Sequence, residues 1–149
     1  MKFKFRKIYI IIFVLVIFIV CIAAFYLSKD PLAQFIEEQT NFEVDKCINK
    51  NGEITVKFGC QLNYDDSEYI EYYSQYCARL VLHTIRVFPR QAKDMPQKVT
   101  IELYDICTEQ YALILSVSGK GLIETQWDKL YEDQLADHVD YYYYNEPAF

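Results

Sequence analysis

The residues EITVKFGCQL, positions 53–62, alternate between apolar and polar side chains along their whole length. The apolar set occupies every second position and consists of Ile54, Val56, Phe58, Cys60 and Leu62. Successive side chains of a strand point to opposite faces of a sheet, so this alternation predicts a strand with one buried face. A turn is predicted just before it, at residues 49–52, which read NKNG.

Two further segments show the same alternation and predict the rest of a small sheet. Residues 99–107 alternate as well, with Val99, Ile101 and Leu103 predicted to face inward and Tyr104 outward. Residues 111–118 place an apolar side chain at every second position, beginning with Tyr111, and this set is predicted to face inward. The connection between these two segments is short, which predicts an antiparallel hairpin. Together with residues 53–62 they predict a roughly three-stranded sheet.

Helices are predicted around these strands. Residues 31–40 follow Asp30 and begin with Pro31, an acidic N-cap and a favoured first helical residue. Residues 67–88 have a broad apolar face at helical spacing, acidic residues before it, and Pro89 after it. A last helix is predicted behind the capping-box pattern TQWD at residues 125–128. The order α-β-α-β-β-α predicts an α+β domain with helices packed on the sheet.

An apolar run, IYIIIFVLVIFIVCIAAFYL, occupies residues 8–27 and directly follows a cluster of basic residues. A helix of about twenty residues spans a ~30 Å hydrocarbon core. Basic residues stay on the cytoplasmic side of a membrane. The run therefore predicts one retained transmembrane helix in the cell membrane, with a cytoplasmic N-terminus and an extracytoplasmic C-terminal domain.

The prediction of a membrane span divides the chain into four parts. Residues 1–7 would be a cytoplasmic basic tail and residues 8–27 the transmembrane helix. Residues 28–52 would be a juxtamembrane helix and linker, and residues 53–149 an extracytoplasmic α+β domain.

The charge of the chain is unevenly distributed. The whole chain carries −6, and residues 1–29 contribute five basic groups and no acidic ones, so residues 30–149 carry −11. A strongly acidic domain is repelled by phosphates, which argues against nucleic acid as a partner.

Four cysteines follow the apolar run, at Cys47, Cys60, Cys77 and Cys107. An even number in an exported domain allows disulfides, with three possible pairings. Cys60 and Cys77 fall on apolar faces, where a free cysteine acts as a small hydrophobic residue. The sequence leaves these two interpretations open. It contains no CxxC pattern, so a zinc site is not expected.

No catalytic or cofactor-binding motif is present in the sequence, so no catalytic residue, cofactor or metal is predicted. A membrane-anchored cell-envelope hydrolase that uses Asp65, Asp66 and Glu68 remains an alternative, and so does an accessory subunit of a transporter. The sequence leaves catalysis open and favours a non-catalytic role.

The 14 tyrosines are the most informative residues for function, and many lie in two clusters. Tyrosine joins a large apolar area to a polar tip and is enriched at protein interfaces. The predicted interaction surface consists of Tyr69, Tyr72, Tyr141, Tyr143 and Tyr144. For the second cluster, residues 141–144, the alternative is a frayed end of the chain in which half of these tyrosines are packed. We therefore expect a non-catalytic, membrane-anchored binding or assembly module with a protein partner. The sequence does not indicate its oligomeric state.

Overall fold

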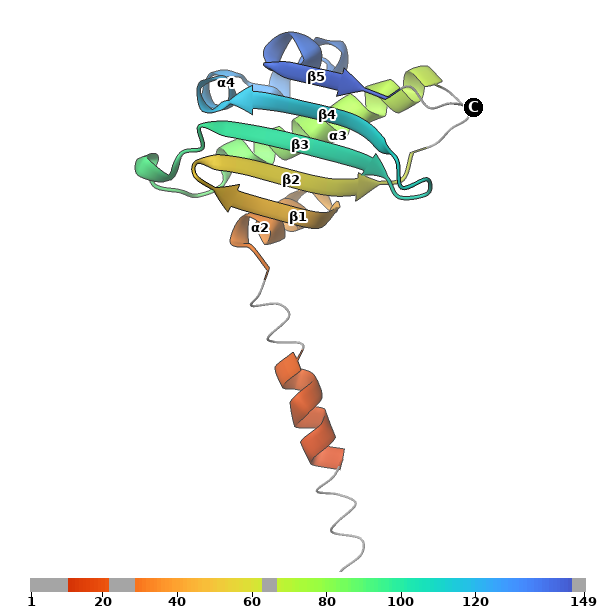
Figure 1. Ribbon diagram of the computed structural model, residues 1–149, viewed down its shortest axis with the longest axis vertical. Helices are drawn as coiled ribbons and strands as arrows, with labels where there is room; N and C mark the ends of the chain where they lie inside the picture. Colours follow the sequence, from red (N-terminus) through yellow and green to blue (C-terminus); the bar gives the residue numbers. More distant parts are fainter. Residues whose placement is uncertain (1–10, 22–28, 63–66, 146–149) are drawn as a thin grey trace, which may run out of the picture. The chain divides into compact units, whose positions relative to one another are not determined.

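The computed structural model describes residues 11–21, 29–62 and 67–145 of the chain (Figure 1). The chain divides into two compact units, Met1–Asp30 and Pro31–Phe149. All strands of the described residues belong to the second unit.

Within the first unit, the described residues 11–21 are helical. No helix in the described ranges is long and apolar enough to cross a membrane. This finding contradicts the predicted single span over residues 8–27, and with it the predicted cell-membrane location and topology. Residues 8–10 and 22–27 of the predicted span lie outside the described residues.

The second unit is built on one five-stranded mixed sheet in the order β1-β2-β3-β4-β5 (Figure 1). β2 and β3 are parallel, and the other neighbouring pairs are antiparallel. The helices and strands are α2 (Pro31–Thr40), β1 (Glu43–Lys50), β2 (Glu53–Cys60), α3 (Ser67–Val87), β3 (Lys98–Asp105), β4 (Tyr111–Ser118), α4 (Gly119–Glu124) and β5 (Tyr141–Tyr144). The described residues of this unit also form the 3-10 helices η1 (Ala92–Asp94), η2 (Trp127–Lys129) and η3 (Glu132–His138).

The core lies between one face of the sheet and α3, which crosses behind the strands (Figure 1). The opposite face of the sheet is not covered by a described helix (Figure 1). The predicted strands 53–62, 99–107 and 111–118 and the predicted helix 67–88 are confirmed as β2, β3, β4 and α3, with small shifts at their ends. The confirmed inward positions of the strands are Ile54, Val56, Phe58, Val99, Ile101, Leu103, Leu113, Leu115 and Val117.

The predicted three-stranded sheet is wrong because it lacks both edge strands, β1 and β5. Only Val44 of β1 is buried, so this strand has no alternation of the kind that marks a half-buried strand. The turn between β1 and β2 was predicted correctly. Asn51 and Gly52 have φ angles of 55° and 81°, and two positive φ angles are typical of the turn that closes a two-residue hairpin.

The predicted last helix is also wrong. After β4 the chain forms α4, η2 and η3, becomes extended at Val139 (φ −119°, ψ 153°) and enters β5. Trp127 fixes this connection, because its side chain is fully buried and its Nε1 donates a hydrogen bond to the Leu122 carbonyl at 2.8 Å. Four consecutive tyrosines suit a strand, since aromatic side chains favour a pleated, half-buried surface.

Candidate functional site

The edge strand β5 consists only of tyrosines. It pairs with β4 on one side, from Ser116 with Tyr141 to Leu113 with Tyr144. No described strand pairs with its other side. An unpaired strand edge offers backbone N–H and C=O groups to an extended chain that meets it.

The side chains of β5 alternate between the two faces of the sheet. Tyr142 and Tyr144 are half-buried and pack against the core, and the Tyr142 hydroxyl donates to Glu71 Oε1 at 3.5 Å. Burial, followed by the nearby Glu71 carboxylate, raises the pKa of Tyr142. Tyr141 and Tyr143 remain 52% and 46% exposed on the uncovered face. Of the predicted surface tyrosines of this cluster, Tyr141 and Tyr143 therefore lie together, and Tyr144 lies on the opposite face.

The other edge of the sheet, β1, has a different character. It carries the charged residues Glu43, Asp45, Lys46 and Lys50 and a register irregularity that begins at Val44. Charged side chains and bulges are means by which proteins prevent an edge from pairing with another chain. β5 has no charged residue, no proline and a regular register. Of the two edge strands that the structure describes, β5 is therefore the one without these protective features.

The uncovered face also carries tyrosines on β3 and β4. Lys57 Nζ lies 4.8 Å from the ring centre of Tyr104 and 5.2 Å from that of Tyr111. Tyr104 is predicted to face outward, and the structure confirms this. Tyr111 is predicted to face inward, and that is wrong, because the β3–β4 register shifts after Leu103 and places Tyr111 opposite Tyr104. Neither residue belongs to the predicted interaction surface.

A hydrogen bond to Asp45 is the main cause that raises the pKa of Tyr104 to about 12, and burial adds to it. The folded state therefore holds this proton more tightly than the unfolded chain, whose value is near 10.0. This contribution to stability is complete below pH 10 and is lost as the pH rises through 12. We expect the denaturant midpoint to fall across this interval, and to fall less steeply in Tyr104→Phe. If the denaturant midpoint fell equally steeply with pH in the wild type and in Tyr104→Phe, the assigned hydrogen bond would be contradicted.

The segment that leads into β5 is strongly acidic. Residues 124–140 contain six acidic residues and one basic residue, Lys129. Asp137 and Asp140 are exposed, and Asp140 Oδ2 accepts a hydrogen bond from the Ser118 N–H at 2.5 Å. Carboxylates therefore lie next to the first residue of β5.

The other predicted tyrosines lie on α3. Tyr69 and Tyr72 are 45% and 50% exposed. Tyr69 stacks on Tyr73 at 5.8 Å between ring centres, and Tyr73 stacks on Tyr76 at 6.2 Å. Because α3 covers the face of the sheet opposite to Tyr141 and Tyr143, the two predicted tyrosine clusters do not form one continuous surface (Figure 1).

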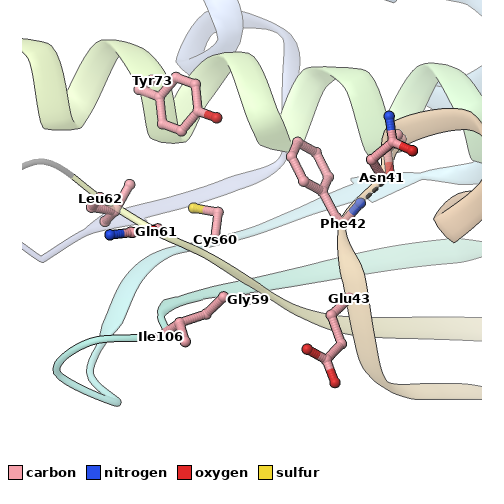
Figure 2. A pocket seen from close by; sticks show the side chains of 10 residues that line it. Asn41, Phe42, Glu43, Gly59, Cys60, Gln61, Leu62, Tyr73 and Ile106 are labelled. Carbon is pink, nitrogen blue, oxygen red and sulfur yellow. Dashed lines mark hydrogen bonds between the residues drawn. The ribbon is translucent and has the colours of Figure 1, made fainter.

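A hollow of about 740 Å³ lies where the start of β1, the end of β2 and α3 come together (Figure 2). Its lining includes Phe42, Glu43, Cys60, Leu62, Tyr73 and Ile106. Figure 2 shows the Cys60 side chain directed from β2 toward α3, which carries Tyr73. Among the described residues, its lining holds one carboxylate, that of Glu43, and no cationic side chain.

The residues of the alternative enzyme hypothesis are only partly covered by the structure. Asp65 and Asp66 lie outside the described residues, and Glu68 lies in the first turn of α3. Among the described residues, no group of three or more histidine, cysteine, aspartate or glutamate side chains could hold a metal ion. The cysteines at Cys47, Cys60, Cys77 and Cys107 are all unlinked.

Comparisons with known proteins gave no match. No family model matched the chain, and neither the search of curated proteins nor the search of solved structures found a similar protein.

Proposed function

We propose that the unit Pro31–Phe149 is a protein-binding module that takes up an extended segment of a partner protein as an added strand on the outer edge of β5. The observation that carries this proposal is the unprotected tyrosine edge, Tyr141–Tyr144, with Tyr141 and Tyr143 exposed beside it. In strand addition, backbone hydrogen bonds supply affinity, and contacts to alternate side chains supply specificity.

The charges around β5 indicate the chemistry of the partner segment. The connection that leads to β5 is acidic, with exposed carboxylates at Asp137 and Asp140. A segment rich in lysine and arginine would be attracted to this region, and an acidic segment would be repelled. Lysine and arginine side chains also interact favourably with tyrosine rings, as Lys57 does with Tyr104 and Tyr111. The proposed partner segment is therefore basic and extended.

A display library of random peptides provides a direct test of this specificity. The full chain is immobilised, bound peptides are selected, and synthetic copies are measured by fluorescence anisotropy. We expect the selected peptides to be enriched in lysine and arginine and to bind as monomers to a monomeric protein. Enrichment of acidic peptides, or self-association of the chain through β5, would contradict the proposed partner class.

The double substitution Tyr141→Ser, Tyr143→Ser is expected to weaken binding of a selected peptide by about tenfold or more, because aromatic anchors carry much of the energy of an interface. Both side chains are about half exposed, so the thermal midpoint should change little. Tyr131→Ser is the matched control, since Tyr131 is 71% exposed and lies outside β5. Equal losses in the control and in the double variant would contradict a role for β5.

Two substitutions at Tyr143 separate charge from aromatic area. Tyr143→Lys and Tyr143→Glu both remove the ring, but they add opposite charges at the same exposed position. A basic partner segment should bind the lysine variant more weakly than the glutamate variant, and the difference should shrink at high salt. The reverse order of affinities would contradict a basic partner.

A further inference from the structure

The backbone groups of β4 alternate between its two neighbouring strands. The Gly119 N–H, directly after β4, donates to the Gln97 carbonyl next to β3 at 2.7 Å. The Ser118 N–H instead donates to Asp140 Oδ2 at 2.5 Å, and the Ser116 carbonyl accepts from the Asp140 N–H at 2.9 Å. Successive residues of an antiparallel ladder face opposite neighbours. The residues of β4 at positions 114 and 116 therefore direct their N–H and C=O groups toward β5.

This alternation assigns the backbone groups of β5 residue by residue. Tyr141 and Tyr143 pair with positions 116 and 114 of β4, so their own N–H and C=O groups face β4. The Asn145 N–H, at the same spacing along the chain, agrees with this and donates to the Ala112 carbonyl at 3.0 Å. Tyr142 lies between Tyr141 and Tyr143 and therefore directs its N–H and C=O groups toward the outer edge of the sheet.

The side chains of the same residues divide in a complementary way. The Tyr142 side chain is half-buried against the core and donates from its hydroxyl to Glu71 Oε1 at 3.5 Å. Tyr141 and Tyr143 present exposed side chains on the uncovered face. Backbone pairing and side-chain recognition at this edge are thus assigned to alternate residues of one short strand.

We infer that a partner segment forms backbone hydrogen bonds with Tyr142 and places two basic side chains, separated by one residue, opposite Tyr141 and Tyr143. Side chains two positions apart on a strand share one face, so both would lie over the exposed tyrosine rings whichever way the added strand runs. A lysine or arginine opposite each ring gains a cation–π interaction. The inference rests on the proposed function and adds to it the recognition pattern basic–any–basic.

Three acetylated heptapeptides with C-terminal amides test the side-chain pattern, each labelled with fluorescein and titrated with the full chain. TVKVKVT carries lysines two positions apart, and TVVKKVT has the same composition with adjacent lysines. TVEVEVT keeps the spacing and reverses the charge. We expect TVKVKVT to bind roughly two- to fivefold more tightly than TVVKKVT, because adjacent lysines point to opposite faces and one cation–π interaction is lost.

Replacement of single backbone amides by esters tests the assignment of the edge. The hydroxy acid analogue of tyrosine, incorporated at position 142 or 143, removes one N–H and keeps the side chain. At Tyr142 the ester should weaken binding of TVKVKVT by roughly fivefold and leave the melting temperature nearly unchanged. At Tyr143, the matched control, it removes a hydrogen bond to β4 and should lower the melting temperature.

The outcomes separate this inference from the proposed function. Equal affinities for TVKVKVT and TVVKKVT, or tighter binding of TVVKKVT, would overturn the recognition pattern and leave strand addition by a basic segment in place. An ester at Tyr142 that leaves binding unchanged, or that lowers the melting temperature as much as the ester at Tyr143, would overturn the backbone assignment. Tightest binding of TVEVEVT, or no binding of either lysine peptide at about 1 mM, would overturn the proposed function itself.

Discussion

Replacement of Trp127 by alanine is expected to lower the free energy of unfolding by about 3–5 kcal/mol. Trp127 is fully buried and is one of the largest side chains of the core. Its removal leaves a cavity and deprives the Leu122 carbonyl of the hydrogen bond donated by the indole Nε1. The residue lies in the connection between β4 and β5, so the substitution should also destabilise the segment that leads into β5.

Circular dichroism in a denaturant titration measures this loss. Fluorescence does not serve for the comparison, because Trp127 is the one tryptophan of the chain. Tyr131→Ser is a suitable control, since Tyr131 is 71% exposed, and its effect should stay within about 0.5 kcal/mol. A loss below about 1 kcal/mol for Trp127→Ala would show that the residue does not fix the β4–β5 connection.

Replacement of Asp105 by alanine should cost about 3 kcal/mol of unfolding free energy. The carboxylate is buried at the end of β3, where Oδ1 accepts from the Leu62 N–H at 3.1 Å. Oδ2 accepts from the N–H and the hydroxyl of Thr108, at 2.8 and 2.7 Å. The substitution leaves these donors without their acceptor and releases the residues after β2 from the β3–β4 turn.

Two further variants make the Asp105 prediction specific. Asp105→Asn keeps the shape and one carbonyl oxygen, so its loss should be smaller than that of Asp105→Ala. Asp94→Ala removes an exposed carboxylate of η1 and should change stability by less than about 0.5 kcal/mol. If Asp105→Ala behaved like Asp94→Ala in urea titrations, the hydrogen bonds of the buried carboxylate would not be stabilising.

The elements that the sequence predicts well are those with one buried face. β2 and β3 bury every second side chain, and α3 buries a broad apolar face, so their periodicity is visible in the residues themselves. β1 buries only Val44 and has charged neighbours, so nothing in its sequence distinguishes it from a loop. Its register is set by pairing with β2 and by the Asn51–Gly52 turn, which are properties of the folded sheet.

The C-terminal region shows a second limit of periodicity. Trp127, Leu135 and Tyr142 have a spacing that suits one helical face, and a helix was the resulting prediction. Trp127 and Leu135 are indeed buried, but from separate 3-10 helices, and Tyr142 packs from a strand. The spacing of apolar residues indicates which side chains are buried in the core. The path of the backbone between them depends on local turns.

The candidate site was accessible to sequence reasoning only in part. A surface role for Tyr141 and Tyr143 was predicted from the density of tyrosines, and both are exposed. The edge position of β5 requires strand order, which the sequence does not contain. The contact of Lys57 with Tyr104 and Tyr111 depends on the pairing of β2, β3 and β4 and on the register shift after Leu103.

Hydrogen exchange of the β5 backbone amides, with and without a selected basic peptide, tests the proposed function most directly. The N–H groups of β5 that point away from β4 are expected to gain protection from exchange when another strand pairs with them. The proposal predicts that bound peptide slows exchange most strongly in β5, and that Tyr141→Ser, Tyr143→Ser reduces this protection. Protection centred on β1 or α3, with β5 unchanged at saturating peptide, would contradict it.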